Sequence, residues 1–229
     1  IRGAELQGIG LEGAEKERFN AIVQELAKLK NDFNNNVLDG TKAFAHRLTD
    51  KEQVAGLPPS ALAMMAATAQ RKGDKAATAE AGPWVATLDG PCLLSILRYA
   101  DDSGLREKVY RAFVSRASEH GDGGDNAPTI DRILSLRSEQ AKLLGYASYA
   151  EVSLAKKMAT LSSAVELLED LRARSFDVAV AEYKELEAYA KTSSLKHWDV
   201  GYYAEKLKKE RFSFDEEETR QYLQLDSVL

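Results

Sequence analysis

The strongest constraint on the fold is the spacing of apolar residues between Ala14 and Phe44. Apolar side chains recur there every three or four residues, with Glu and Lys between them. This spacing places the apolar side chains on one face of a helix and the charged ones on the other. The sequence therefore predicts a long amphipathic helix. Its apolar positions are Phe19, Ile22, Val23, Leu26, Leu29, Phe33, Val37 and Phe44.

Further helix signals follow along the chain. The segment from Leu57 to Ser60 contains two prolines and predicts a helix start, because Pro is favoured in the first turn, and Gly73 follows the expected end. Pro128 begins another predicted helix, which Gly145 closes as a left-handed cap. The apolar spacing over residues 92–99 and 105–118 is also helical.

Helix caps are predicted in the last third of the chain. Ser163 to Glu166 forms a capping box for a long helix, and Ser213 to Glu216 forms one for a short final helix. Between them, Asp199 is expected to cap a helix that runs through Tyr203 and Leu207.

A strand is predicted only over residues 83–88, Pro-Trp-Val-Ala-Thr-Leu, which stop at Asp89-Gly90-Pro91. Because this strand is short, we expect a mostly α, multi-helical protein with one small β-strand region. We divide the chain into residues 1–82, a long helix and helical hairpin region, and residues 83–229, a short strand followed by a helical region. We expect the two parts to form one continuous helical segment of a larger protein.

The composition and motifs exclude several functions. A net charge of -5 and a pI near 5.4 argue against a nucleic-acid surface. No run of roughly 18 apolar residues is present, so no membrane insertion is expected. Phosphate-binding glycine loops and the G-x-S-x-G serine motif are absent from the sequence. The single cysteine, Cys92, excludes an intrachain disulfide and favours an intracellular, reducing compartment.

No metal site or catalytic residue is predicted within this chain. The histidines His46, His120 and His197 are far apart in sequence, and none has a second His or Cys at metal-ligand spacing. His46 and Asp50 are expected to form a surface polar pair if the first helix continues. The acidic loop that ends at Asn126 lacks the spacing of a calcium-binding loop, so a flexible polar loop is predicted.

The predicted strand suggests a substrate-binding site at Trp84, Thr87 and Asp89. An exposed edge strand can pair with the backbone of an extended peptide and bind it with little sequence preference. The alternative is structural: Trp84 packs in the core, and Asp89 caps the following helix. The residues alone leave both interpretations open.

Several segments resemble, in the same order, the thimet/neurolysin/oligopeptidase A family of zinc peptidases, with the oligopeptidase A-like branch of plant and algal organellar enzymes closest. The longest are residues 84–91, 105–118, 137–154 and 156–159. Shorter matches extend the resemblance over nearly the whole chain: residues 17–20, 37–39, 56–58, 198–199 and 222–225.

The resemblance implies an ellipsoidal, mostly helical shell whose two halves enclose a deep channel, so that only short unfolded peptides reach the zinc. Zinc in such peptidases is held by an H-E-x-x-H helix, which this chain lacks. The chain therefore resembles the middle segment of the family. Zinc is expected in the parent protein, none is expected to be bound by this segment, and no catalytic residue is carried over. The strand from Trp84 to Leu88 is expected to border the channel.

The resulting hypothesis is a segment of a zinc-dependent metallo-oligopeptidase that cleaves short unstructured peptides, such as targeting peptides. This segment would supply a channel wall, would be inactive alone, and would have short peptides and the remainder of the peptidase chain as partners. A chloroplast, a mitochondrion or the cytosol would suit such a protein. The alternatives are a non-catalytic helical peptide- or protein-binding module and a helical scaffold in a larger assembly.

Overall fold

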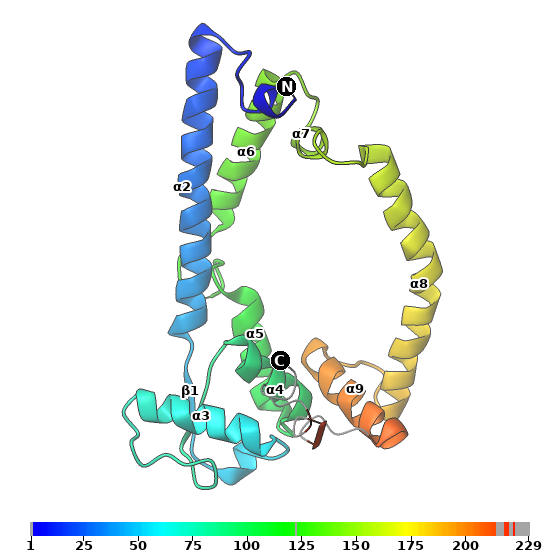
Figure 1. The fold of residues 1–229 in the computed structure, drawn as a ribbon. Helices are drawn as coiled ribbons and strands as arrows, with labels where there is room; N and C mark the ends of the chain where they lie inside the picture. Colours follow the sequence, from blue (N-terminus) through cyan, green and yellow to red (C-terminus); the bar gives the residue numbers. More distant parts are fainter. Residues whose placement is uncertain (1, 122, 214–217, 220–221, 223–229) are drawn as a thin grey trace. The chain divides into compact units, whose positions relative to one another are not determined.

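The computed structural model describes residues 2–121, 123–213, 218–219 and 222, and it is mostly helical, with one small antiparallel sheet (Figure 1). The predicted fold class is confirmed. The chain divides into two compact units. Unit 1 comprises Ile1–Leu38, Ala117–Glu119 and Gly123–Val180, and unit 2 comprises Asp39–Arg116, His120–Asp122 and Ala181–Leu229. The predicted boundary after residue 82 falls inside unit 2.

Unit 1 is built on two helices, α2 and α6. The long helix predicted from the apolar spacing is α2, and α6 begins beside Pro128 as expected. Gly145 follows α6 with a φ of 79°, as predicted for a left-handed cap. The helices that lie wholly or partly in this unit are α1 (Arg2–Glu5), α2 (Gly13–Ala43), α6 (Ala127–Leu143), α7 (Tyr149–Leu154) and α8 (Leu161–Tyr189).

The core of unit 1 lies between α2 and α6. Ile22 and Leu26 of α2 pack against Ile133 and Leu136 of α6. Asn126, just before α6, is 3% exposed. Its side chain accepts a hydrogen bond from Asn36 at 2.9 Å and donates one to the Phe33 carbonyl at 3.1 Å. The prediction of a flexible polar loop is therefore wrong at Asn126, which anchors the start of α6 to α2.

Unit 2 contains the small sheet and the larger core. Its elements are β1 (His46–Leu48), η1 (Lys51–Val54), α3 (Pro59–Arg71), β2 (Trp84–Ala86), α4 (Gly90–Tyr99), α5 (Ser103–Ser115) and α9 (His197–Phe212). β1 and β2 pair antiparallel, with Leu48 opposite Trp84. Met65, Ile96 and Val109, from α3, α4 and α5, are fully buried with these two residues. The sheet is thus held in a helical core.

Some predicted helix ends differ from the structure. α8 begins at Leu161, and the Thr160 hydroxyl oxygen accepts a hydrogen bond from the Ser163 amide at 3.1 Å. Thr160 therefore caps this helix, and the prediction of Ser163 as the cap is wrong. Asp199 lies inside the first turn of α9, which begins at His197. The predicted box from Ser213 to Glu216 lies mostly outside the described residues.

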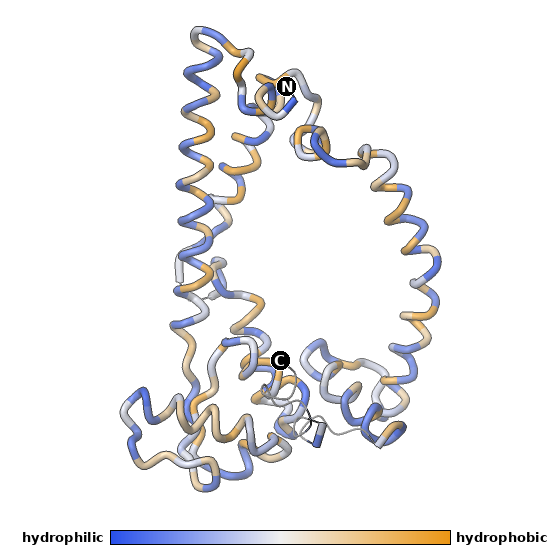
Figure 2. Tube along the Cα trace, in the orientation of Figure 1, coloured by the Kyte–Doolittle hydropathy of each residue, from blue (hydrophilic) through white to orange (hydrophobic). Residues whose placement is uncertain are grey.

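α8 carries apolar side chains that are not covered. None of its residues is buried, and apolar and polar residues alternate along it (Figure 2). At 100° per residue, Leu161, Val165, Leu168 and Phe176 share one face of the helix. These four side chains, here called the α8 stripe, are between 46% and 65% exposed. Isolated surface apolar residues are ordinary, but several large ones on one helix face indicate an interaction surface.

Candidate functional site

The predicted site residue Trp84 lies in the core of unit 2. It is 1% exposed, and its indole nitrogen donates a hydrogen bond to the Ala79 carbonyl at 3.1 Å. The other two residues of β2, Val85 and Ala86, are also buried. Burial suits the apolar body of the indole, and the hydrogen bond to Ala79 satisfies its polar N–H. In the structure, Trp84 therefore packs in the core and is not exposed for contact with a peptide.

Thr87 and Asp89 are brought together directly after β2. The Thr87 hydroxyl donates a hydrogen bond to Asp89 Oδ2 at 2.9 Å, and its amide donates one to Cys92 Sγ at 3.4 Å. Asp89 is exposed and occupies the N-cap position of α4, but its side chain makes no capping hydrogen bond. Thr87 and Asp89 therefore form a small polar site at the surface, while Trp84 lies in the core.

Arg106 forms a buried charged network that the sequence did not predict. Its side chain is 3% exposed, and Nη2 and Nε donate to Asp199 Oδ1 at 2.6 and 3.0 Å. Nη1 donates to the Ala100 carbonyl at 2.5 Å. Both members of the pair fall within the segments that resemble the peptidase family. This resemblance was the only sequence signal that could have drawn attention to them. The pair joins α5 to the first turn of α9.

An aromatic ring extends this network. The Arg106 guanidinium lies 4.0 Å from the centre of the Tyr202 ring, a cation–π contact. The Tyr202 hydroxyl donates to Asp101 Oδ1 at 2.6 Å, and this hydrogen bond lowers the pKa of Asp101. Burial, together with the bond to Asp101, raises the pKa of Tyr202. The groups are mutually satisfied, so the network serves structure rather than proton transfer.

The described residues do not fit a zinc ion. No three of their His, Cys, Asp or Glu side chains are grouped as metal ligands would be. His46 lies in β1, not in a helix, and its Nδ1 is 3.1 Å from the Lys108 ammonium rather than paired with Asp50. His197 stacks on Tyr110 at 6.2 Å between ring centres. We therefore assign no zinc chemistry to these side chains.

Cys92 has no features of a nucleophile. It is 3% exposed, and burial raises the pKa of its thiol. A buried protonated thiol is inert, because the thiolate is the reactive form.

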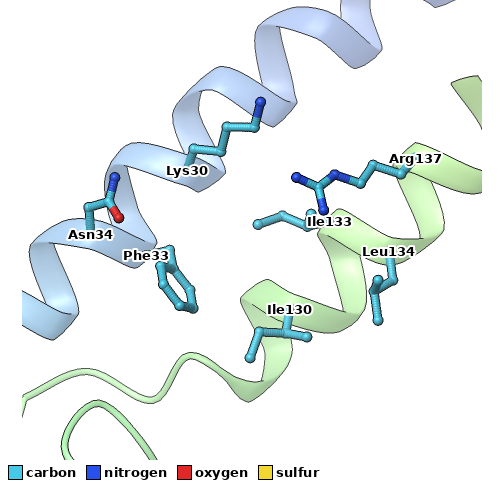
Figure 3. A pocket seen from close by; sticks show the side chains of 7 residues that line it. All are labelled: Lys30, Phe33, Asn34, Ile130, Ile133, Leu134 and Arg137. Atoms are coloured by element: carbon cyan, nitrogen blue, oxygen red, sulfur yellow. The ribbon is translucent and has the colours of Figure 1, made fainter. Parts of the chain in front are cut away.

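A groove lies between α2 and α6 within unit 1 (Figure 3). Its volume is about 320 Å³. In Figure 3, Lys30 projects from α2 and Arg137 from α6 toward the space between the helices, with Phe33 and Ile130 further along it. The groove is lined by Lys30, Phe33, Asn34, Ile130, Ile133, Leu134 and Arg137. It is thus mainly apolar, with two cations and no carboxylate among its lining residues.

Two arginines of α2 and α6, Arg18 and Arg132, are neutralised by carboxylates. Arg18 binds Glu139 through two hydrogen bonds, both of 2.6 Å, and Arg132 binds Glu25 through bonds of 2.5 and 2.8 Å. The hydrogen bond from Arg132 lowers the pKa of Glu25. These carboxylates stay ionised at neutral pH, so both pairs are intact there. Among the described residues, the two cations of the groove differ from these arginines in having no carboxylate partner.

No described helix combines the length and the apolar character needed to cross a bilayer.

Comparison with known proteins gives one family. Residues 96–229 match the family model of peptidase family M3. The chain is 49% identical to the probable cytosolic oligopeptidase A of Arabidopsis thaliana, over 100% of this chain and 33% of that protein. The identity to the organellar oligopeptidase A, chloroplastic/mitochondrial, of Arabidopsis thaliana is also 49%, over 100% of this chain and 30% of that protein. Oligopeptidase A of Escherichia coli is 39% identical, over 97% of this chain and 33% of that protein. The chain thus spans about a third of the length of these relatives.

Proposed function

Because this chain belongs to peptidase family M3, we propose that it is a segment of a zinc-dependent oligopeptidase and contributes a wall of the substrate channel. The proposal rests on one observation: the whole chain matches oligopeptidases of about three times its length but contains no H-E-x-x-H. The zinc ligands and the catalytic centre then lie elsewhere in the parent polypeptide. The segment alone has no hydrolytic activity.

The α8 stripe supports the remainder of the peptidase chain as a partner. Four large apolar side chains on one helix face are about half exposed or more. Burying a Leu or Phe side chain contributes about 1.5–3 kcal/mol. A longer polypeptide that covers this stripe gains this stabilisation, which the segment alone lacks.

The substrates we propose are short unstructured peptides, such as targeting peptides. The names of the relatives, oligopeptidases, support short peptides as the substrate class. In this proposal, Thr87 and Asp89 contact the peptide backbone through their hydroxyl and carboxylate groups, and Trp84 holds the preceding strand in the core. The relatives named as cytosolic and as chloroplastic/mitochondrial support an intracellular location in one of these compartments.

The first test is the denatured mass of the natural polypeptide, with peptide mapping beyond Leu229. We expect a species much heavier than 25.2 kDa that yields a peptide containing H-E-x-x-H. The natural polypeptide should cleave a quenched fluorescent peptide and lose this activity with a zinc chelator, while the 229-residue chain should be inactive. A natural species near 25.2 kDa without that motif would overturn the proposal.

A non-catalytic peptide- or protein-binding module is the second candidate, and the α2–α6 groove favours it. This module would bind peptides without turnover, and its natural polypeptide would have a mass near 25.2 kDa. The mass measurement therefore separates the two candidates directly.

A further inference from the structure

The α2–α6 groove holds two cationic side chains that lack an acidic partner. In the part of the chain that the structure describes, neither Lys30 nor Arg137 hydrogen-bonds or pairs with a carboxylate, although Arg18 and Arg132 on the same two helices do. Like charges that face each other repel, and an anion between them converts the repulsion into attraction. The groove is thus complementary to a negative charge.

Arg137 is positioned and incompletely satisfied. Its guanidinium lies 4.8 Å from the centre of the Tyr149 ring, a cation–π contact that fixes its orientation. Its Nε is buried and has no hydrogen-bond partner among the described atoms. A buried donor without a partner is uncommon in folded proteins and requires an explanation. A ligand oxygen would supply an acceptor to this guanidinium.

The rest of the groove requires an apolar group beside the anion. Phe33, Ile130, Ile133 and Leu134 line it, and Ile130 and Leu134 are 43% and 57% exposed. A volume of about 320 Å³ is at the small end of the ~300–1,000 Å³ range of small-ligand sites. It therefore suits one or two residues of a chain and excludes a folded partner. A bare phosphate would leave the apolar part unused.

We propose that this groove binds the C-terminal end of a short peptide, with the free carboxylate between Lys30 and Arg137 and an apolar terminal side chain against Phe33, Ile130 and Leu134. The choice of a peptide, rather than another apolar carboxylate, rests on the proposed oligopeptidase function. The Asn34 amide, one helical turn after Lys30, is placed to hydrogen-bond the last peptide group. Such a site would retain short peptides by their carboxyl ends.

The test is binding of a labelled peptide to the 229-residue chain. A fluorescein-labelled pentapeptide that ends in Leu-COOH is compared, by fluorescence polarisation, with the same peptide as a C-terminal amide. We expect the acid to bind about threefold to tenfold more tightly, which corresponds to two partly exposed charged contacts, one with Lys30 and one with Arg137. Binding of the acid should weaken with added salt, because exposed charges are screened.

Matched variants locate the binding to this groove. Lys30→Gln and Arg137→Gln should each weaken binding of the acid by about threefold or more. Each should therefore reduce the difference in affinity between the acid and the amide. Leu134→Ser, at an exposed position, should weaken both peptides equally. The control is Lys28→Gln, which removes the same charge from α2 outside the groove, where Lys28 pairs with Asp32 at 2.6 Å. Circular dichroism establishes that each variant is folded.

The inference is overturned if the acid and the amide bind equally, if Lys28→Gln weakens binding as much as Lys30→Gln, or if the acid shows no binding up to about 1 mM. These outcomes do not depend on the proposed function. The proposed function fails on the mass and sequence of the natural polypeptide, whereas the groove fails on peptide binding by this chain.

Discussion

At the scale of single residues, the most consequential side chain is Arg106. Its charge is buried and is neutralised by Asp199, and its guanidinium also donates hydrogen bonds to two backbone carbonyls. Removing one partner of such a pair leaves an uncompensated buried charge and costs about 3–5 kcal/mol. The pair therefore fixes α9 against α5 with high specificity, whatever its net contribution to the free energy of unfolding.

Gly56 and Gly145 form a natural comparison, because their φ angles are 81° and 79°. A Cβ at Gly56 would lie 2.2 Å from the Tyr99 carbonyl oxygen, whereas one at Gly145 would meet nothing within 4 Å. We expect Gly145→Ala to lower the free energy of unfolding by about 1–2 kcal/mol, because only the left-handed backbone conformation is unfavourable for Ala there. Gly56→Ala should cost about 2–5 kcal/mol, because overpacking is added. Urea unfolding followed by circular dichroism measures both, and equal costs would contradict the role assigned to the Tyr99 carbonyl.

The stability of unit 2 should depend on the protonation of His46. Burial, and then the nearby Lys108 ammonium, lowers the pKa of His46 below its ordinary value of about 6.5. The unfolded chain therefore binds this proton more readily, so the folded state loses stability as the pH falls through 6.5 and below. In His46→Gln, the decline between about pH 7 and pH 5 should be smaller.

Lys108→Met provides the matched test of the cause. It removes the repulsive charge and leaves most of the burial, so it should reduce the pH dependence less than His46→Gln does. Unfolding midpoints measured at several pH values check this. If the dependence of stability on pH is unchanged in His46→Gln, other groups cause the loss of stability at low pH.

At the scale of elements, the sequence predicted best what depends on local periodicity. α2 and α6 were predictable because each repeats apolar residues every three or four positions and has a recognisable end, such as Gly145. β1 was not, since its three residues, His-Arg-Leu, carry no alternation and become a strand only by pairing with β2. At α8, Thr160 and Ser163 both have cap chemistry, and each side chain accepts a hydrogen bond from the other's amide. Only the structure shows that the helix begins directly after Thr160.

Among the candidate sites, too, contacts between neighbouring residues were predictable and contacts between distant helices were not. Thr87 and Asp89 are two residues apart, so their contact was within reach of sequence analysis. Lys30 with Arg137, and Arg106 with Asp199, are brought together by packing between helices far apart in the chain. No local pattern encodes such pairs, and this is why the groove and the buried network were missed.

The α8 stripe gives a prediction at this scale. In the 229-residue chain, Leu168→Ser should change the free energy of unfolding by less than about 0.5–1 kcal/mol, because the side chain is already 65% exposed. The same variant should reduce binding of an apolar dye. In the longer parent polypeptide that we propose, the expected cost is about 2–5 kcal/mol, since a buried Leu would be lost.

The control for α8 is Asp177→Ser, which changes an exposed position away from the stripe. It should be nearly neutral in both contexts. If Leu168→Ser is also neutral in the natural polypeptide, the remainder of that chain does not cover the stripe.

At the scale of the whole molecule, the two units should be distinguishable in unfolding. Both tryptophans of the chain, Trp84 and Trp198, lie in unit 2. Tryptophan fluorescence therefore reports unit 2, while far-ultraviolet circular dichroism reports the helices of both units. Non-coincident transitions of two probes are the sign that unfolding is not two-state.

Asn126→Ala, in unit 1, tests this division. It removes two side-chain hydrogen bonds at a buried position and leaves the Phe33 carbonyl without this donor, which should cost about 1–3 kcal/mol. We expect the dichroism transition to move to lower urea, while the midpoint of fluorescence stays unchanged. Gly56→Ala should instead move the fluorescence midpoint. If Asn126→Ala shifts both probes equally, the two units unfold as one.

The separation between Arg106 and Asp199 also has a consequence during synthesis on the ribosome. The two residues are 93 positions apart, and translation proceeds at about 5–20 residues per second. For roughly 5–20 seconds after Arg106 is made, its partner does not yet exist. Throughout that interval, the nascent α5 cannot bury this guanidinium in its final environment. Unit 2 must therefore complete its folding late, after α9 has emerged, and chaperones have access to its unfinished core until then.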